Sequence, residues 1–304
     1  MHFILLIEIF TGIMPMLVQF IINGLITGIL YSLSAIGFAL VYNTTKIFHI
    51  AAAALYVAAA YIFYFAFHTL ALPSLFSAVI ALVCTALLSI LCEWSVYRPL
   101  YNKKSSLNVV MISSIGAMTV LINVIAMIFG NETKVLDNSI QRVYTFNDII
   151  VTTPQLWQLI AGLVAIVCFV IFLKFSKFGL KAKALSNDNI LFEVLGFNIT
   201  VMRILVFALS GVFLALGSCL TAYDIGMDPH VGMPLLINAM VAMIIGGTGR
   251  FEACIIGGIL LGILQALVVY QFSANWQNAI TFLALLLFLF FRPQGVMGYK
   301  KRMV

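Results

Sequence analysis

Nine apolar stretches, most of them long enough to cross a membrane as a helix, divide this chain of 304 residues. About 20 apolar residues cross a bilayer in this form, because a helix satisfies its backbone polar groups within the segment. Only 9% of the residues are charged, whereas soluble domains carry about 25%, so lipid is the solvent for most of the chain. We therefore predict an all-α fold, a polytopic membrane bundle of about 8–9 transmembrane helices that forms one domain over residues 1–304. The predicted crossings are residues 16–42, 47–69, 74–97, 107–129, 156–174, 201–222, 235–249, 253–272 and 276–292.

The basic residues are distributed unevenly among the gaps between these stretches. All of the 16 Lys and Arg except Lys134 and Arg142 fall in alternate gaps. Positively charged loops stay in the cytoplasm, so this pattern predicts an outer N-terminus, a polar outer loop at 130–155 and a basic cytoplasmic tail at 293–304. The same rule accounts for the net charge of +6 without a nucleic-acid partner. The chain is therefore predicted to cross a membrane several times.

Two segments leave the number of crossings open. Residues 1–15 are apolar and form either a short lead-in helix at the outer surface or an extension of the first crossing. The stretch at 235–249 is short and ends in a run that contains Gly246, Gly247 and Gly249. A re-entrant or broken helix there would reduce the count to eight. We interpret the glycine run as a tight cytoplasmic turn, because it lacks the Gly-Lys-Ser/Thr ending of a phosphate loop.

The basic inner loop at 174–200 contains a candidate docking helix. Asp188 suits the positive end of a helix, and Gly196 suits the left-handed residue that follows its last turn. A short helix of this kind is unstable alone, so its apolar stripe requires a partner protein or the membrane surface. Ser186 or Asn187 is the expected N-cap. The residues assigned to this helix are Ser186, Asn187, Asp188, Ile190, Leu191, Glu193, Val194, Leu195 and Gly196.

Glycines at four-residue spacing mark two of the stretches. Gly24 and Gly28 form one pair, and Gly258 and Gly262 form the other. Small residues at this spacing let helix backbones approach closely within a membrane. Packing inside the bundle is the expected use, and dimerisation through one of these faces is the alternative.

Few polar side chains lie within the apolar stretches. No Asp or Glu lies near the middle of any stretch, which argues against a proton- or sodium-coupled carrier. His49 is interpreted as a helix-end histidine, and the five single Cys predict neither a disulfide framework nor a metal site. The uncharged polar residues either join helices or line a polar path. The candidates for such a path are Asn23, Thr27, Ser34, Ser113, Ser114, Asn123 and Asn238.

Several segments together resemble the LivH-type permease subunits of branched-chain amino acid ABC importers. The similarity extends over essentially the whole chain. The segments are 23–37, Tyr97-Arg98-Pro99-Leu100, 112–116, 178–196, 228–232, Ile245-Gly246-Gly247-Thr248-Gly249 and Arg292-Pro293-Gln294-Gly295. One segment departs from the family pattern. Where the family has a run like Asn-Phe-Ala-His-Gly, residues 48–54 read Phe-His-Ile-Ala-Ala-Ala-Ala, which leaves open whether substrate or helix packing differs.

This resemblance implies a transport subunit of a bacterial inner membrane that is not itself an enzyme. Two permease subunits, homologous or identical, would form the membrane path, and two cytoplasmic ATPases would bind ATP and Mg²⁺. A periplasmic binding protein would deliver branched-chain or related amino acids. The helix at 186–196 would be the coupling helix that docks on the ATPase, and this chain would bind no cofactor or metal. The alternatives are the same architecture for urea, short amides or a sugar, and a self-contained carrier or channel.

Overall fold

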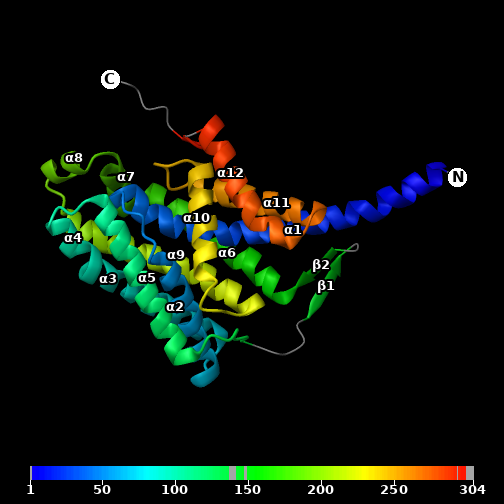
Figure 1. The fold of residues 1–304 in the computed structure, drawn as a ribbon, viewed down its shortest axis with the longest axis horizontal. Helices are drawn as coiled ribbons and strands as arrows, with labels where there is room; N and C mark the ends of the chain where they lie inside the picture. Colours follow the sequence, from blue (N-terminus) through cyan, green and yellow to red (C-terminus); the bar gives the residue numbers. More distant parts are fainter. Residues whose placement is uncertain (1, 137–141, 147–148, 293, 299–304) are drawn as a thin grey trace.

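The computed structural model describes residues 2–136, 142–146, 149–292 and 294–298. Within these residues, eight helices are long and apolar enough to cross a membrane, which confirms the predicted polytopic helical bundle (Figure 1). Five crossings are formed by single helices: α1 (His2–Thr45), α5 (Leu107–Phe129), α6 (Thr153–Phe175), α9 (Ile199–Ile225) and α11 (Ala253–Gln271). Two others include a π-helical turn: α2 (Ala52–Tyr64) continues into Phe65–Thr69, and α3 (Ser74–Cys92) continues through Glu93–Tyr97 into α4 (Arg98–Asn102). In the last crossing, a 3-10 turn (Ala274–Trp276) precedes α12 (Gln277–Phe291).

A shorter helix, α10 (Gly232–Gly246), lies among these crossings. Its 15 residues span about 22 Å, less than the roughly 30 Å of the hydrocarbon core. The chain just before α10 pairs with Lys134 beyond the end of α5, through Met227. The chain just after α10 reaches the end of α1, where the Gly249 N–H donates to Asn43 Oδ1 over 3.1 Å. This unbroken helix therefore runs between the two ends of the bundle, enclosed by α1, α2, α11 and α12.

The first helix is the centre of the molecule. α1 is continuous from His2 to Thr45, so residues 2–15 extend the first crossing. Its described part packs against α6, α9, α10 and α11, and Figure 1 shows it passing through the middle of the bundle. The predicted second crossing began at residue 47, but α2 begins at Ala52. The chain turns sharply between the two helices because Lys46 adopts a left-handed φ of 60°.

Both glycine pairs lie in the contact between α1 and α11, which confirms packing within the bundle. A Cβ atom on Gly28 would lie 2.8 Å from the Ile259 Cα, and one on Gly262 would lie 2.5 Å from the Gly28 Cα. Ser32 Oγ crosses the same contact and donates to the Ile255 carbonyl over 2.9 Å. Glycine is required here because the two backbones touch without intervening side chains.

The segment at 130–155, predicted to be an outer loop, contains secondary structure that the sequence analysis did not predict. Strands β1 (Val143–Phe146) and β2 (Ile149–Thr152) pair antiparallel, with Val143 opposite Thr152. β-branched and aromatic residues favour this pairing. Gln19 of α1 holds β2, because its side-chain amide exchanges two hydrogen bonds of 2.8 Å with the backbone of Ile150. We call this end of the bundle the hairpin end.

The opposite end carries α7 (Lys177–Asn187) and α8 (Asn189–Val194), which together occupy the predicted inner loop. Ser176 caps α7 by accepting the Gly179 N–H over 3.0 Å. α7 packs against α1, α6 and α9, whereas α8 projects from the bundle (Figure 1). We call this the basic end, because it holds α7 with Lys177, Lys181 and Lys183.

Candidate functional site

A buried ion pair joins two helices near the basic end. Arg203 of α9 donates from Nε to Glu93 Oε1 over 2.7 Å and from an Nη to Oε2 over 3.1 Å. The two side chains are only 5% and 2% exposed. The guanidinium also lies over the Tyr101 ring, 4.4 Å from its centroid. Glu93 opens the π-helical turn that leads into α4, so the pair fixes α9 against the end of the third crossing.

A hydrogen-bonded chain of buried side chains lies beside this pair. His49 Nδ1 shares a 2.7 Å hydrogen bond with the Tyr97 hydroxyl, which in turn lies 2.6 Å from Ser114 Oγ. Ser114 accepts the Ala51 N–H over 3.0 Å, at the start of α2. His49 is therefore a helix-end histidine with one ring nitrogen satisfied, and Nε2 has no partner among the described residues.

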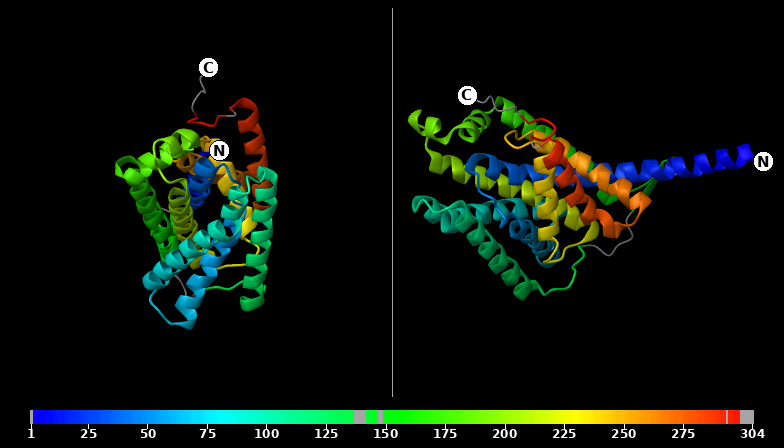
Figure 2. Two further views of the ribbon diagram at one scale, coloured as in Figure 1. Left: turned by 90° about the vertical axis from the view of Figure 1, so that its left-hand side faces the viewer. Right: turned by 45° about the horizontal axis from the view of Figure 1, so that its top comes forward.

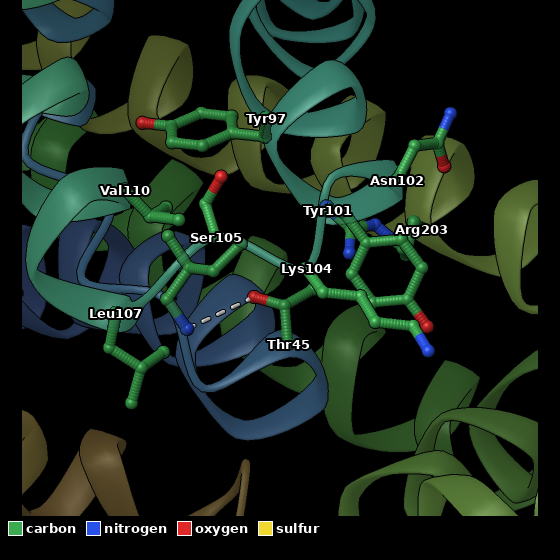
Figure 3. A pocket seen from close by; sticks show the side chains of 10 residues that line it. Thr45, Tyr97, Tyr101, Asn102, Lys104, Ser105, Leu107, Val110 and Arg203 are labelled. Carbon is green, nitrogen blue, oxygen red and sulfur yellow. Dashed lines mark hydrogen bonds between the residues drawn. The ribbon is translucent and has the colours of Figure 1, made fainter.

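A cavity of about 530 Å³ opens between these groups at the basic end (Figure 3). The Tyr101 ring and Arg203 lie together on one side, and the Tyr97 hydroxyl points away from them. Thr45 Oγ1, at the end of α1, accepts the Ile47 N–H over 3.3 Å. The lining residues are Thr45, Ile47, Tyr97, Tyr101, Asn102, Lys104, Ser105, Leu107, Val110 and Arg203.

Three of the predicted path residues are in the interior, and two of them, Asn238 and Ser114, join helices. Asn238 Oδ1 accepts hydrogen bonds from Gln265 Nε2 (3.2 Å) and Thr281 Oγ1 (3.1 Å). Tyr31 extends this cluster by donating to Gln265 Oε1 over 2.9 Å, so four helices share it. Ser34 is fully buried and donates to its own helix, and Ser114 belongs to the His49 chain.

The other predicted path residues lie in two separate places. Asn23 and Thr27 line a cavity of about 170 Å³ between α1, α11 and Gln277. Ser113 is half-buried on α5, and Asn123 is exposed almost three turns further along that helix. The seven residues therefore form no single site.

The candidate docking helix takes a different start from the one predicted. Asp188 is the N-cap of α8, since its Oδ1 accepts the N–H groups of Ile190 (2.8 Å) and Leu191 (3.1 Å). Ser186 and Asn187 instead end α7. A carboxylate satisfies two free N–H groups and suits the helix dipole, which explains why Asp188 takes this position. Gly196 follows the helix with a φ of 80°.

The apolar stripe of α8 faces outward. Ile190 and Val194 are each 77% exposed, and Leu191 and Leu195 are more than half exposed. Phe192 points the other way, is buried, and packs against Phe197 with ring centroids 5.1 Å apart. Glu193 also lies on the exposed side. The four outward residues form a free apolar surface, which we call the α8 face.

Two contacts connect this segment to the rest of the basic end. Lys183 of α7 pairs with Glu252, which precedes α11, over 2.7 Å. Lys46 Nζ donates to the Ser186 carbonyl over 3.4 Å and to the Asn43 carbonyl over 2.9 Å. A displacement of α7 would therefore reach both the end of α1 and the turn between α10 and α11.

That turn contains Gly246, Gly247 and Gly249. Gly247 and Gly249 have φ values of 128° and 100°, which side-chain-bearing residues rarely adopt. Residues 294–298 lie directly on the turn. The N–H groups of Val296 and Met297 donate to the Ile245 and Gly246 carbonyls over 2.8 and 2.9 Å.

Sequence reasoning missed the groups that hold this end together. Glu93 and Arg203 lie within about one turn of the ends of their apolar stretches and are 110 positions apart in the sequence. Their charge made each of them unusual, but nothing in the sequence indicated that they form a pair. Thr119 and His230, which line a cavity with Asn123, carried no signal beyond their polarity.

Comparison with known proteins extends over nearly the whole chain. A family model described as "Branched-chain amino acid transport system / permease component" matches residues 20–289. The chain is 26% identical over 294 residues to the high-affinity branched-chain amino acid transport system permease protein BraD of Pseudomonas aeruginosa, covering 92% of this chain and 95% of BraD. It is 25% identical, with the same coverage, to the corresponding LivH of Escherichia coli strain K12.

Among solved structures, PsaBC from Streptococcus pneumoniae in complex with Fab is similar in fold. The TM-score is 0.51 at 16% identity, over 90% of this chain and 91% of that one. Since the family model matches residues 20–289, this chain belongs to the family of branched-chain amino acid transport system permease components.

Proposed function

We propose that this chain is the membrane permease subunit of an ATP-driven importer that moves branched-chain amino acids across a bacterial inner membrane. The exposed α8 face at the basic end is the observation that carries the ATP-driven part of the proposal. The names of the relatives support the substrate class, since each names branched-chain amino acid transport.

The α8 face would dock in a groove on a cytoplasmic ATPase. A helix with outward apolar side chains at i, i+1, i+4 and i+5 fits such a groove. Two ATPase subunits would bind ATP and Mg²⁺, so this chain needs no nucleotide site of its own. The predicted cytoplasmic orientation of the basic end supports this arrangement.

Movement of α8 would reach the bundle through α7. The Lys183–Glu252 pair links α7 to the start of α11, and the Lys46 contacts link it to the end of α1. Because α1 and α11 pack backbone to backbone through their glycines, they would move as one body. ATP binding would then bias the bundle between outward-open and inward-open states.

At the hairpin end, a periplasmic binding protein would deliver the amino acid. A second permease subunit, homologous or identical, would complete the membrane path.

Affinity purification in mild detergent tests this proposal. We expect the tagged chain to recover two ATPases and a second permease, and we expect leucine with its binding protein to stimulate ATP hydrolysis by the complex. Uptake by liposomes that contain this chain alone, without ATP, would contradict the ATP-driven proposal. Stimulation by urea or a sugar, with no response to leucine, would contradict the substrate class.

A further inference from the structure

The exposed face of α5 differs from the other exposed faces of the bundle. Between Leu75 and Leu91 of α3, every exposed residue is a large apolar one, as expected of a surface that meets lipid. α5 packs mainly against α2 and stands at the edge of the bundle (Figure 2). Its exposed side nevertheless carries Gly116, Thr119 and Asn123.

These three residues lie together on the side of α5 that faces away from the bundle. At about 100° per residue, positions 116, 119 and 123 fall within about 60° of one another. The buried residues Val110, Ser114 and Ile125 lie on the opposite side. Ile112 and Met127, which are 66% and 86% exposed, lie on the same side. The resulting stripe is therefore mixed, with polar groups where a helix that meets lipid would be apolar throughout.

Within the described part of the chain, the hydrogen bonds of the stripe leave part of the Asn123 amide without a partner. Thr119 Oγ1 donates to the Ile115 carbonyl over 3.0 Å, and Asn123 Nδ2 donates to the Thr119 carbonyl over 2.8 Å. A side-chain amide has a second N–H and a carbonyl oxygen. Lipid offers these groups nothing, whereas water or a polar solute would satisfy them.

A cavity of about 440 Å³ lies against this stripe in the half of α5 nearer the hairpin end. Its volume falls within the roughly 300–1,000 Å³ of small-molecule sites. Thioether and aliphatic side chains share its wall with two amides and an imidazole. Asp228 Oδ1 accepts the backbone N–H of His230 over 2.6 Å, which fixes the chain just before α10. The lining residues are Met118, Thr119, Ile122, Asn123, Ala126, Met127, Asn131 and His230.

We propose that this cavity is a substrate site on the outer half of the translocation path, and that it takes an amino acid zwitterion with an aliphatic side chain. Met118, Ile122 and Met127 contact the aliphatic part. Asn123 and His230 bind the carboxylate and ammonium groups at the polar edge. The choice of substrate rests on the proposed function, and the location of the site rests on the α5 stripe and the cavity beside it.

Thiol labelling in the assembled importer tests the path. Thr119→Cys and Asn123→Cys are introduced after Cys84 and Cys168, the two less buried native cysteines, are replaced by Ser. A charged, membrane-impermeant methanethiosulfonate is added from the hairpin side. Leu87→Cys on α3 and Val167→Cys on α6, both exposed on apolar faces, are the matched controls.

We expect rapid labelling at 119 and 123, none at the two controls, and slower labelling at 119 and 123 when leucine and its binding protein are present. Absence of labelling at 119 and 123 would overturn the aqueous path. Labelling of the isolated subunit but not of the assembled importer would show that α5 is a protein interface instead. Labelling that leucine does not slow would overturn the substrate site.

Uptake by two variants tests the site independently. A Cβ atom added at Gly116 would have no heavy atom within 4 Å, so the leucine side chain of Gly116→Leu would project into open space. We therefore expect this variant to fold as the unmodified chain does. We expect assembly to be unchanged and leucine uptake to fall about tenfold or more. Asn123→Leu is expected to raise the leucine concentration for half-maximal uptake about tenfold or more. Asn123→Gln keeps an amide and is expected to bring that concentration most of the way back to the unmodified value.

Normal uptake by both Gly116→Leu and Asn123→Leu would overturn the site while leaving the proposed function intact. If the unmodified importer moves no leucine, the proposed function fails. The labelling rates at 119 and 123 without leucine still decide whether α5 lines an aqueous path.

Discussion

Single residues hold the basic end of the bundle through charge. The Glu93–Arg203 pair is almost fully buried and doubly hydrogen-bonded, whereas Lys183 and Glu252 form a pair that is 42% and 35% exposed. Removing one partner of a buried pair leaves the other charge with neither a partner nor water around it. Removing one partner of an exposed pair leaves a charge that water still solvates. The two pairs therefore differ in kind: the first fixes the fold, and the second joins elements that would move in the proposed cycle.

Arg203→Leu is expected to destabilise the protein by about 3–5 kcal/mol, because Glu93 would then be a buried charge without a partner. The double variant Glu93→Leu/Arg203→Leu should regain most of that loss. Unfolding by SDS titration in micelles measures both. Equal stability of Arg203→Leu and the unmodified chain would contradict the role of the pair, and Lys183→Leu serves as the exposed control.

At the scale of elements, close backbone contact and outward apolar surface have opposite purposes. The α1–α11 contact is built by glycines that leave no room for a side chain, whereas the α8 face exposes side chains that no other described residue covers. The first makes two helices one body, and the second makes a short helix dependent on a partner.

Gly262→Ala is expected to cost about 1–3 kcal/mol of stability, because the added methyl would meet the backbone of α1. Gly116→Ala is the matched control on an open helix face and should be neutral or slightly stabilising, since Ala favours helix. SDS unfolding of the two variants compares them. Similar stability for both would show that the α1–α11 contact can separate without cost.

Leu191→Asp or Leu195→Asp is expected to abolish ATP-driven uptake without unfolding the protein, because the α8 face would lose its apolar contact with the ATPase. Uptake and copurification of the ATPase measure this. Phe192→Asp is the contrasting variant and should reduce folded protein, since Phe192 is buried. Normal uptake by Leu191→Asp would contradict the coupling role of α8.

At the scale of the whole molecule, the contacts at the basic end form a continuous connection. α8 adjoins α7, α7 pairs with the segment before α11, and α11 packs on α1. In the proposed transport cycle, movement of α8 would reach the bundle through the Lys183–Glu252 pair, the Lys46 contacts and the packing of α7 against α1, α6 and α9. Charge reversal at the pair therefore tests the connection rather than the fold.

Lys183→Glu is expected to reduce leucine uptake about fivefold or more by placing two carboxylates together, which is the scale of a typical coupling free energy. The swapped variant Lys183→Glu/Glu252→Lys should restore uptake. ATP hydrolysis by the complex is the control, since uncoupling leaves basal hydrolysis intact. Failure of the swap to restore uptake would remove this pair from the connection.

Hydropathy predicted the bounds of a helix well where a change in backbone conformation coincides with the end of the apolar stretch. The predicted bounds of α5 agree with the structure because Ser106 is extended and Gly130 adopts a left-handed φ of 86°. The start of α2 was five residues early, since the apolar residues 47–51 belong to a turn that only the φ of Lys46 reveals. Hydropathy also failed to predict the β-hairpin, which lies in a polar loop.

Neighbour relations among the helices could not be predicted in the same way. An apolar stretch has no pattern that names its partner, so the pairing of Glu93 with Arg203 and of Asn238 with Gln265 and Thr281 emerged only in three dimensions. The glycine pairs predicted close packing within the bundle, but not that α1 and α11 pack against each other. The α8 face was predicted from spacing, but its cap at Asp188 was not.

The contact of residues 294–298 with the Gly246–Gly249 turn bears on how the chain matures. The carbonyls at the end of α10 accept the N–H groups of Val296 and Met297, which are translated after every helix. During synthesis, α10 and α11 enter the membrane before these acceptors can be satisfied from within the chain. The basic end can therefore close in this way only after Val296 and Met297 have left the ribosome.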